Sequence, residues 1–113
     1  MSEIPIWTPD PGRIQGTNLH RFMTFTENRN GLNFSAYADL HRWSIEHPEL
    51  FWRNLVDFSQ VRASTWGEII KTSGNTMPST RWFPNAQLNF TENLLSQKGE
   101  SDAIVFWGED KIR

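Results

Sequence analysis

The sequence predicts a mainly α-helical fold, with about four helices and a short β element at the C-terminal end. Apolar residues recur at helical spacing through most of residues 11–59, and one run, Ala103 to Trp107, is β-branched and aromatic. The chain also holds six Trp and eight Phe in 113 residues, with few small aliphatic residues to fill the gaps between them. We therefore expect one modest core, with some of the rings covering a neighbouring domain.

The first predicted helix covers residues 11–30. Thr8 to Pro11 supplies cap residues followed by prolines, which a first turn tolerates because its N–H groups lack intrahelical partners. Gly31 fits the end of the helix, whereas Gly12 and Gly16 weaken its first turns. The buried face is expected to comprise Leu19, Phe22, Met23 and Phe25.

Two further helices follow. Ser35 is predicted to cap a helix that runs to about residue 47, and Pro48 to start one that runs to about residue 59. The buried stripe of the earlier helix is expected to be Tyr37, Leu40 and Trp43. The later helix is apolar over more than half of its circumference, so it needs cover on two sides.

Less regular structure is predicted after residue 59. Residues 60–79 are expected to form a loop with a short strand near Trp66. Asn89 to Glu92 has the form of a capping box, which predicts a helix over residues 90–96.

The run from Ala103 to Trp107 is predicted to be a strand, followed by a hairpin turn over Gly108 to Lys111 and a partner beginning at Ile112. A single strand leaves its backbone donors and acceptors unpaired. We therefore expect residues 103–107 to belong to a sheet that continues beyond the chain.

Charge and composition narrow the possible partners. The net charge is −2, from 11 basic and 13 acidic residues that are mixed along the chain, so neither nucleic acid nor a membrane is an expected partner. Cysteine is absent, which removes disulfides and thiolate chemistry. The opening Met1-Ser2-Glu3-Ile4-Pro5 lacks the basic start and apolar run of a secretory signal, and the longest apolar run is far shorter than a membrane span. A cytoplasmic location is expected.

Motif-like stretches favour structural interpretations. Lys71-Thr72-Ser73-Gly74 has the letters of a phosphate loop in the wrong order, and a simple loop is favoured. Asn33 and Asn89 match glycosylation sequons but are interpreted as helix caps. The histidines lack zinc-ligand spacing, and His41 is expected to be partly buried on a core-facing helix. No catalytic, cofactor-binding or metal-binding residue is predicted.

Arg81-Trp82-Phe83-Pro84 admits two interpretations. In one, Arg81 pairs with a carboxylate or phosphate and Trp82 forms a pocket wall; in the other, which is favoured, the rings anchor the segment and Arg81 lies at a domain surface. Pro84 is expected to hold Phe83 extended. The predicted interface or anchor residues are Arg81, Trp82, Phe83, Trp52 and Trp107.

Four stretches together resemble a known family: Thr80 to Leu95 (TRWFPNAQLNFTENLL), Ile6-Trp7-Thr8-Pro9, Leu40-His41-Arg42-Trp43-Ser44 and Ala103 to Asp110 (AIVFWGED). In this order they resemble the amino-terminal segment of the acetoacetyl-CoA synthetases, AMP-forming acid–thiol ligases related to acetyl-CoA synthetase. The resemblance spans essentially all 113 residues. It implies that residues 1–113 form an N-terminal helical domain that caps a larger α/β adenylate-forming enzyme.

The resemblance also implies a reaction and partners. Family members use ATP, Mg2+ and coenzyme A to convert acetoacetate into acetoacetyl-CoA through an acyl-adenylate. Their phosphate-binding loop, adenine contacts and mobile lysine lie beyond the segment matched here, so no cofactor is expected to bind this segment and its partner is the remainder of its own polypeptide. Two alternatives remain: a self-standing helical interaction module with an exposed aromatic face, and another short-chain acyl-CoA synthetase with the same cap.

Overall fold

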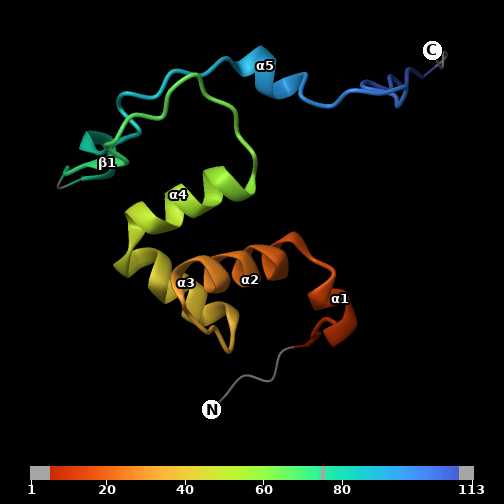
Figure 1. Ribbon diagram of the computed structural model, residues 1–113. Coiled ribbons are helices and arrows are strands. Elements are labelled where there is room, and N and C mark those ends of the chain that lie inside the picture. The colour runs from red at the N-terminus through yellow and green to blue at the C-terminus, as the bar shows by residue number, and fades with distance from the viewer. Residues whose placement is uncertain (1–5, 75, 110–113) are drawn as a thin grey trace.

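The computed structural model describes residues 6–74 and 76–109 (Figure 1). It is mainly helical, as predicted, with five α-helices and one two-stranded sheet among the described residues. In order, the elements are α1 (Pro11–Gln15), α2 (Asn18–Asn30), α3 (Tyr37–Glu46), α4 (Pro48–Phe58), β1 (Lys71–Thr72), the 3-10 turn η1 (Met77–Ser79), β2 (Arg81–Trp82) and α5 (Phe90–Leu94).

The single helix predicted over residues 11–30 is wrong, because the chain breaks into α1 and α2 at Gly16 and Thr17. Asp10 caps α1, accepting a hydrogen bond of 2.8 Å from the Gly12 N–H. Thr17 is extended and caps α2 by accepting from the His20 N–H at 3.2 Å. The Thr17 side chain can bond the backbone of a new helix, so the chain can end one helix and start another at this point instead of continuing.

The start of α3 also differs from the prediction. Ala36, not Ser35, is the N-cap, and the Asp39 carboxylate accepts hydrogen bonds of 3.0 Å from the N–H groups of both residues. The aspartate in the first turn thus replaces the expected serine cap. Leu40 is buried as predicted, but Tyr37 is 58% exposed and does not belong to the buried stripe.

Helices α2, α3 and α4 lie together and form the core (Figure 1). Its buried apolar residues are Phe22, Leu40 and Trp43. The Phe22 ring meets Phe51 and Phe58 of α4 edge to face, at centroid distances of 5.7 and 5.3 Å. The partly buried residues around this cluster are Met23, Phe25, Leu32, Phe34, Phe51, Leu55 and Phe58. Phe and Trp therefore supply much of the core.

Gly31 ends α2 as predicted. It adopts a left-handed conformation with φ of 66°, and its N–H donates to the Glu27 carbonyl oxygen. The Leu32 N–H donates to the same oxygen at 3.1 Å, which is the 6→1 hydrogen bond found in a Schellman motif. This turn brings Leu32 back against the core.

The β structure lies in the middle of the chain's second half. β1 and β2 are antiparallel, with Lys71 opposite Trp82 and Thr72 opposite Arg81. The loop predicted for residues 71–74 is therefore wrong at its first two residues. The strand expected near Trp66 is a single bridge between Thr65 and Gln87.

Helix α5 begins at the predicted cap. The Asn89 Oδ1 accepts from the N–H groups of Thr91 and Glu92 at 2.9 and 3.2 Å, and the helix ends at Leu94, two residues before the predicted end. Asn33 does not cap a helix, because α3 begins only after Ala36.

Residues 103–106 form no strand, and Trp107 takes part in a single β-bridge only. Backbone pairing at this end therefore needs a partner strand. That these residues join a sheet continued beyond the chain stays a prediction. The second half of the predicted hairpin turn, residues 110–111, lies outside the described residues, and so does the predicted partner strand from Ile112.

The molecule is less compact than a globular chain of the same length. Its radius of gyration is 19.0 Å, whereas a compact chain of this length has a radius of about 13 Å. Its accessible surface is 10025 Å², against about 6,400 Å² for a compact monomer of this mass. Figure 1 shows why: the chain after α4 runs as an extended layer beside the helices, and the part after α5 leads away from them.

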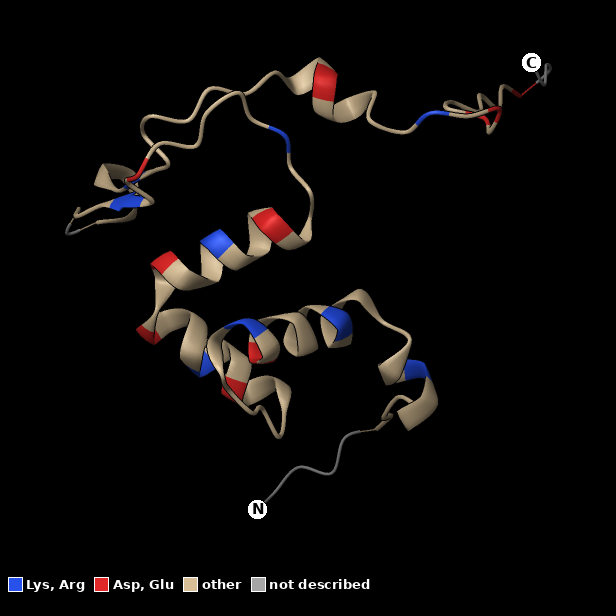
Figure 2. Cartoon of the chain, in the orientation of Figure 1, with Lys and Arg blue, Asp and Glu red and all other residues tan. Residues whose placement is uncertain are grey.

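Charged residues of both signs are interspersed along the ribbon (Figure 2). On α4 they alternate as Glu49, Arg53 and Asp57. The Asp57 carboxylate accepts a hydrogen bond of 2.6 Å from Arg29 and so joins α4 to α2. It also forms an ion pair of 3.4 Å with Arg53 of its own helix. The described part of the chain has no helix that is both long and apolar enough to cross a membrane.

Candidate interface

Two of the predicted anchors pack against each other. Trp52 of α4 and Trp82 of β2 lie with ring centroids 5.2 Å apart. Trp52 also meets Phe51 edge to face at 5.5 Å, and the Lys71 Nζ lies 5.6 Å from the Trp82 ring centroid. Side-chain stacking thus attaches the β hairpin to the helical core.

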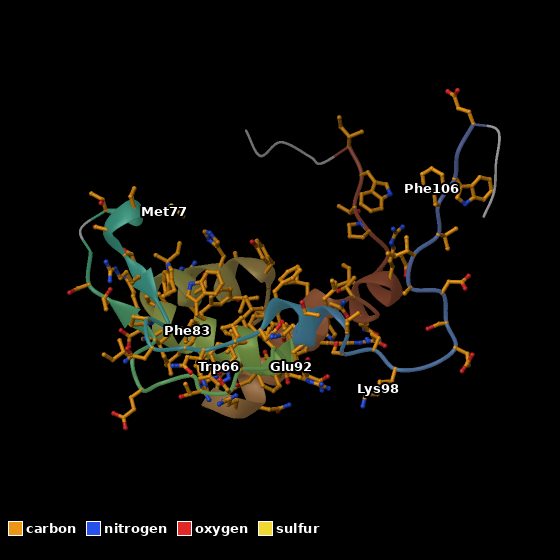
Figure 3. The ribbon with its side chains drawn as sticks, turned by 90° about the horizontal axis from the view of Figure 1, so that it is seen from above. Trp66, Met77, Phe83, Glu92, Lys98 and Phe106 are labelled. Carbon is orange, nitrogen blue, oxygen red and sulfur yellow. The ribbon has the colours of Figure 1, made fainter. Side chains whose placement is uncertain are left out.

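Phe83 packs elsewhere in the same hairpin. Its ring meets Trp66 edge to face at 5.1 Å, and Figure 3 shows the two side by side. The prediction that Pro84 keeps Phe83 extended is wrong, since Phe83 has a φ of 44°. Its N–H donates to the Ile70 carbonyl oxygen at 2.7 Å and its own carbonyl accepts from the Ala86 N–H at 2.9 Å. The turn that follows β2 holds Phe83 in the left-handed region.

Gly67 lies against this turn and escaped the sequence analysis. Its φ is 68°, and a Cβ added to it would come 2.7 Å from the Cβ of Asn85. The positive φ and the short distance both require glycine at this position. Because Gly67 has no side chain, the segment around Trp66 can approach residues 83–86 closely. A glycine directly after an aromatic residue was the available signal.

Arg81 is fixed through its backbone. Its N–H donates to the Thr72 Oγ1 at 3.2 Å, and that hydroxyl donates to the Arg81 carbonyl at 3.4 Å. The residue is exposed, and it takes part in none of the ion pairs between described residues. Its role at a domain surface stays a prediction.

Trp107 lies apart from the other predicted anchors. It is 73% exposed, on the segment that runs away from the hairpin after α5. Its neighbour Phe106 stands at the end of the molecule opposite Met77 of the hairpin tip (Figure 3). The structure thus brings Trp52 and Trp82 into contact, with Arg81 and Phe83 on either side of Trp82, and leaves Trp107 separate.

A second feature that escaped the sequence analysis is the attachment of α5. The Asn93 Oδ1 accepts from the Arg62 N–H at 2.7 Å, and its Nδ2 donates to the Arg62 carbonyl at 2.8 Å and to the Asn89 carbonyl at 2.9 Å. One amide side chain thus pairs with the backbone as a strand would. Next to it, a group of apolar side chains is exposed: Leu88, Phe90, Leu94 and Leu95.

The stretch that shares letters with a phosphate loop is part of the hairpin. Lys71 and Thr72 form β1, and a Cβ at Gly74 would lie 2.5 Å from the Ser79 carbonyl carbon. Gly74 thus packs against the returning chain instead of opening a cradle for phosphate. His41 is exposed, contrary to the expected partial burial. Among residues 6–74 and 76–109, no group of three or more His, Asp or Glu side chains is placed to hold a metal ion.

Comparison with known proteins identifies the class. The model of the family described as "Acetyl-coenzyme A synthetase N-terminus" matches residues 37–94, which include α3, α4, the hairpin and α5. The chain therefore belongs to this family.

Two named relatives and one solved structure add detail. Acetoacetyl-coenzyme A synthetase of Rhizobium meliloti (strain 1021) is 35% identical over 98% of this chain and 17% of its own length. Malonamoyl-CoA synthetase vrtB of Penicillium aethiopicum is 34% identical over 74% of this chain and 12% of its own length. The solved acetoacetyl-CoA synthetase from Streptomyces lividans matches with a TM-score of 0.73 and 34% identity, over 81% of this chain and 14% of that one.

The chain thus spans about a sixth of the length of the curated relatives it matches most extensively. It corresponds to one segment of a larger polypeptide.

Proposed function

We propose that this chain is the N-terminal structural segment of an acetoacetyl-CoA synthetase. The observation that carries the proposal is the 35% identity over 98% of the chain to a protein of that name, supported by the match to a solved acetoacetyl-CoA synthetase. In the full enzyme, ATP and acetoacetate would give an acyl-adenylate and pyrophosphate, and the thiol of coenzyme A would then displace AMP. The proposal includes the expected cytoplasmic location.

In the proposed role this segment itself binds no ATP, Mg2+ or coenzyme A. The stretch at Lys71 is committed to the hairpin, and the clustered rings pack on one another. We therefore assign this chain a structural role and derive no chemical step from its residues. Its large accessible surface and exposed apolar side chains support a segment that packs on the rest of its polypeptide.

Acetoacetate is the proposed substrate because proteins named acetoacetyl-CoA synthetases match the chain over about nine-tenths of its length or more. The malonamoyl-CoA synthetase shares the same kind of segment. A different short acyl acid is therefore the competing assignment.

The test is pyrophosphate release by the full-length polypeptide with ATP, Mg2+ and coenzyme A. Acetoacetate, acetate and malonamate would be compared at equal concentrations. We expect the highest kcat/KM with acetoacetate, and acetoacetyl-CoA as the product by mass spectrometry. A preference for another acid would overturn the substrate assignment, and a native coding sequence that ends at Arg113 would favour the self-standing interaction module.

A further inference from the structure

The apolar group on and beside α5 has no cover within the described chain. Leu88, Phe90, Leu94 and Leu95 are between 54% and 77% exposed. Phe90 and Leu94 are four residues apart on one helix, so they lie on the same side of it one turn apart. Large apolar residues this exposed, within eight residues of one another along the chain, indicate a surface that meets another protein surface.

Hydrogen bonds within the chain fix the orientation of this surface. A five-residue helix has little stability of its own, because its few hydrogen bonds barely offset the cost of the first turn. Here two hydrogen bonds of Asn93 attach α5 to the Arg62 backbone, and a third joins Asn93 to the Asn89 carbonyl at the start of the helix. The hydrogen bonds between Gln87 and residues 64–65 hold the chain just before α5. The backbone of α5 is therefore fixed while its apolar side chains face solvent.

We propose that this α5 surface, comprising Leu88, Phe90, Leu94 and Leu95, docks on the part of the same polypeptide that follows Arg113, with Asn93 as the residue that positions it. The inference rests on the proposed function and deepens it by assigning the contact surface.

Two observations favour this occupant over a second copy of the segment. More than four-fifths of the matched relatives' length lies outside the aligned segment, so a large body of the same chain is at hand. The open shape, with a radius of gyration of 19.0 Å, leaves α5 outside the helical core and accessible to that body.

Hydrogen–deuterium exchange of the full-length polypeptide tests the proposal. The wild type is compared with Leu94→Ser and with Ile45→Ser, a matched control because Leu94 and Ile45 are both apolar helix residues with 66% exposure. We expect the α5 amides to exchange at least about tenfold more slowly than an unstructured peptide of the same sequence, and Leu94→Ser to abolish most of that protection. Ile45→Ser should leave α5 unchanged.

Asn93→Ala and Leu94→Met separate docking from simple unfolding. Asn93→Ala should weaken α5 protection, whereas Leu94→Met keeps the apolar contact and should retain it. Unprotected α5 amides in the wild type would overturn the proposal. Protection that rises with protein concentration would overturn it in favour of a second copy.

Failure of the docking surface and failure of the proposed function give different results. Acetoacetate-dependent pyrophosphate release with an unprotected α5 would leave the function standing and remove the docking surface. A protected α5 sensitive to Leu94→Ser, in a protein without that activity, would support the docking surface and overturn the function.

Discussion

The helical core of α2, α3 and α4 and the layer after α4 (residues 59–109) are held together by different means. In the core, side chains distant in sequence bury one another, as Phe22 does with Phe51 and Phe58. In the layer, backbone hydrogen bonds join the outgoing and returning chain, such as Ser64 to Gln87 at 2.8 Å and Phe83 to Ile70 at 2.7 Å.

This difference shows which region buries its own apolar side chains. Apolar burial supplies most folding free energy and hydrogen bonds mainly fix geometry, so the core can stabilise itself while the layer has its shape set but its apolar side chains uncovered. Stability is therefore expected to be unequal within the chain. The following predictions test that inequality in the 113-residue chain.

Phe22→Ala should have the largest effect. It removes a buried ring from the centre of the core, which costs about 3–5 kcal/mol, and the helical circular dichroism signal should be lost at much lower urea concentration. The matched control is Phe90→Ala, which removes an exposed ring from the layer and should change the free energy of unfolding by less than about 0.5 kcal/mol. Equal losses in both variants would show that the chain has no separate core.

Gly67→Ala should act on the layer instead. The added methyl group would lie 2.7 Å from the Asn85 Cβ at a φ of 68°, a conflict expected to cost about 1–3 kcal/mol. Amide exchange at Ser64 and Gln87 should accelerate while the core amides keep their rates.

Gly16→Ala is the control for that substitution. Gly16 has a φ of −78° and its nearest atom would be 3.6 Å from a new Cβ, so alanine should be neutral or slightly stabilising. If the two variants behave alike, the close approach at Gly67 does not constrain the layer.

The helical core and the layer after α4 also differ in how well the sequence predicted them. The start of α4 and the caps of α1 and α5 followed from Pro48, Asp10 and Asn89, because those signals act within one turn of the chain. The break between α1 and α2 was missed because Thr17 can lie inside a helix or cap one, and local sequence does not decide between them.

The layer was predicted least well. Strands of two residues have no detectable period, and β1 and β2 are identified only by their pairing. Phe83 takes a positive φ because its hydrogen bond to Ile70 and the following turn outweigh the local preference before proline.

The candidate interface shows the same limit. Trp52 and Trp82 could be singled out as aromatic anchors, but their contact joins residues far apart in sequence and depends on the tertiary fold. The contact of Trp66 with Phe83 and that of Asn93 with Arg62 also join residues far apart in sequence, so no local pattern predicted these contacts.

The contact between Trp52 and Trp82 links the two regions, and its strength decides how independent they are. A double-mutant cycle with Trp52→Ala, Trp82→Ala and the double variant should give a coupling free energy of about 0.5–1.5 kcal/mol, the range for an aromatic pair. Urea unfolding followed by circular dichroism measures each corner. A coupling near zero would mean that the hairpin and core unfold independently.

Apart from the control variants, Asp57→Asn should have the smallest effect, because it acts within the core but at its partly exposed edge. The substitution removes the carboxylate shared by Arg29 and Arg53 and should cost up to about 1 kcal/mol at low salt. The loss should shrink as salt is raised, since counterions screen the pairs.

Arg42→Gln is the control for the charge effect. It breaks a longer pair, 3.7 Å to Asp39, whose arginine side chain is 69% exposed, so the change in unfolding free energy should be smaller and equally salt-sensitive. A larger loss in Arg42→Gln than in Asp57→Asn would show that bridging α2 to α4 adds nothing to the core. Its stability would then rest on the rings around Phe22 alone.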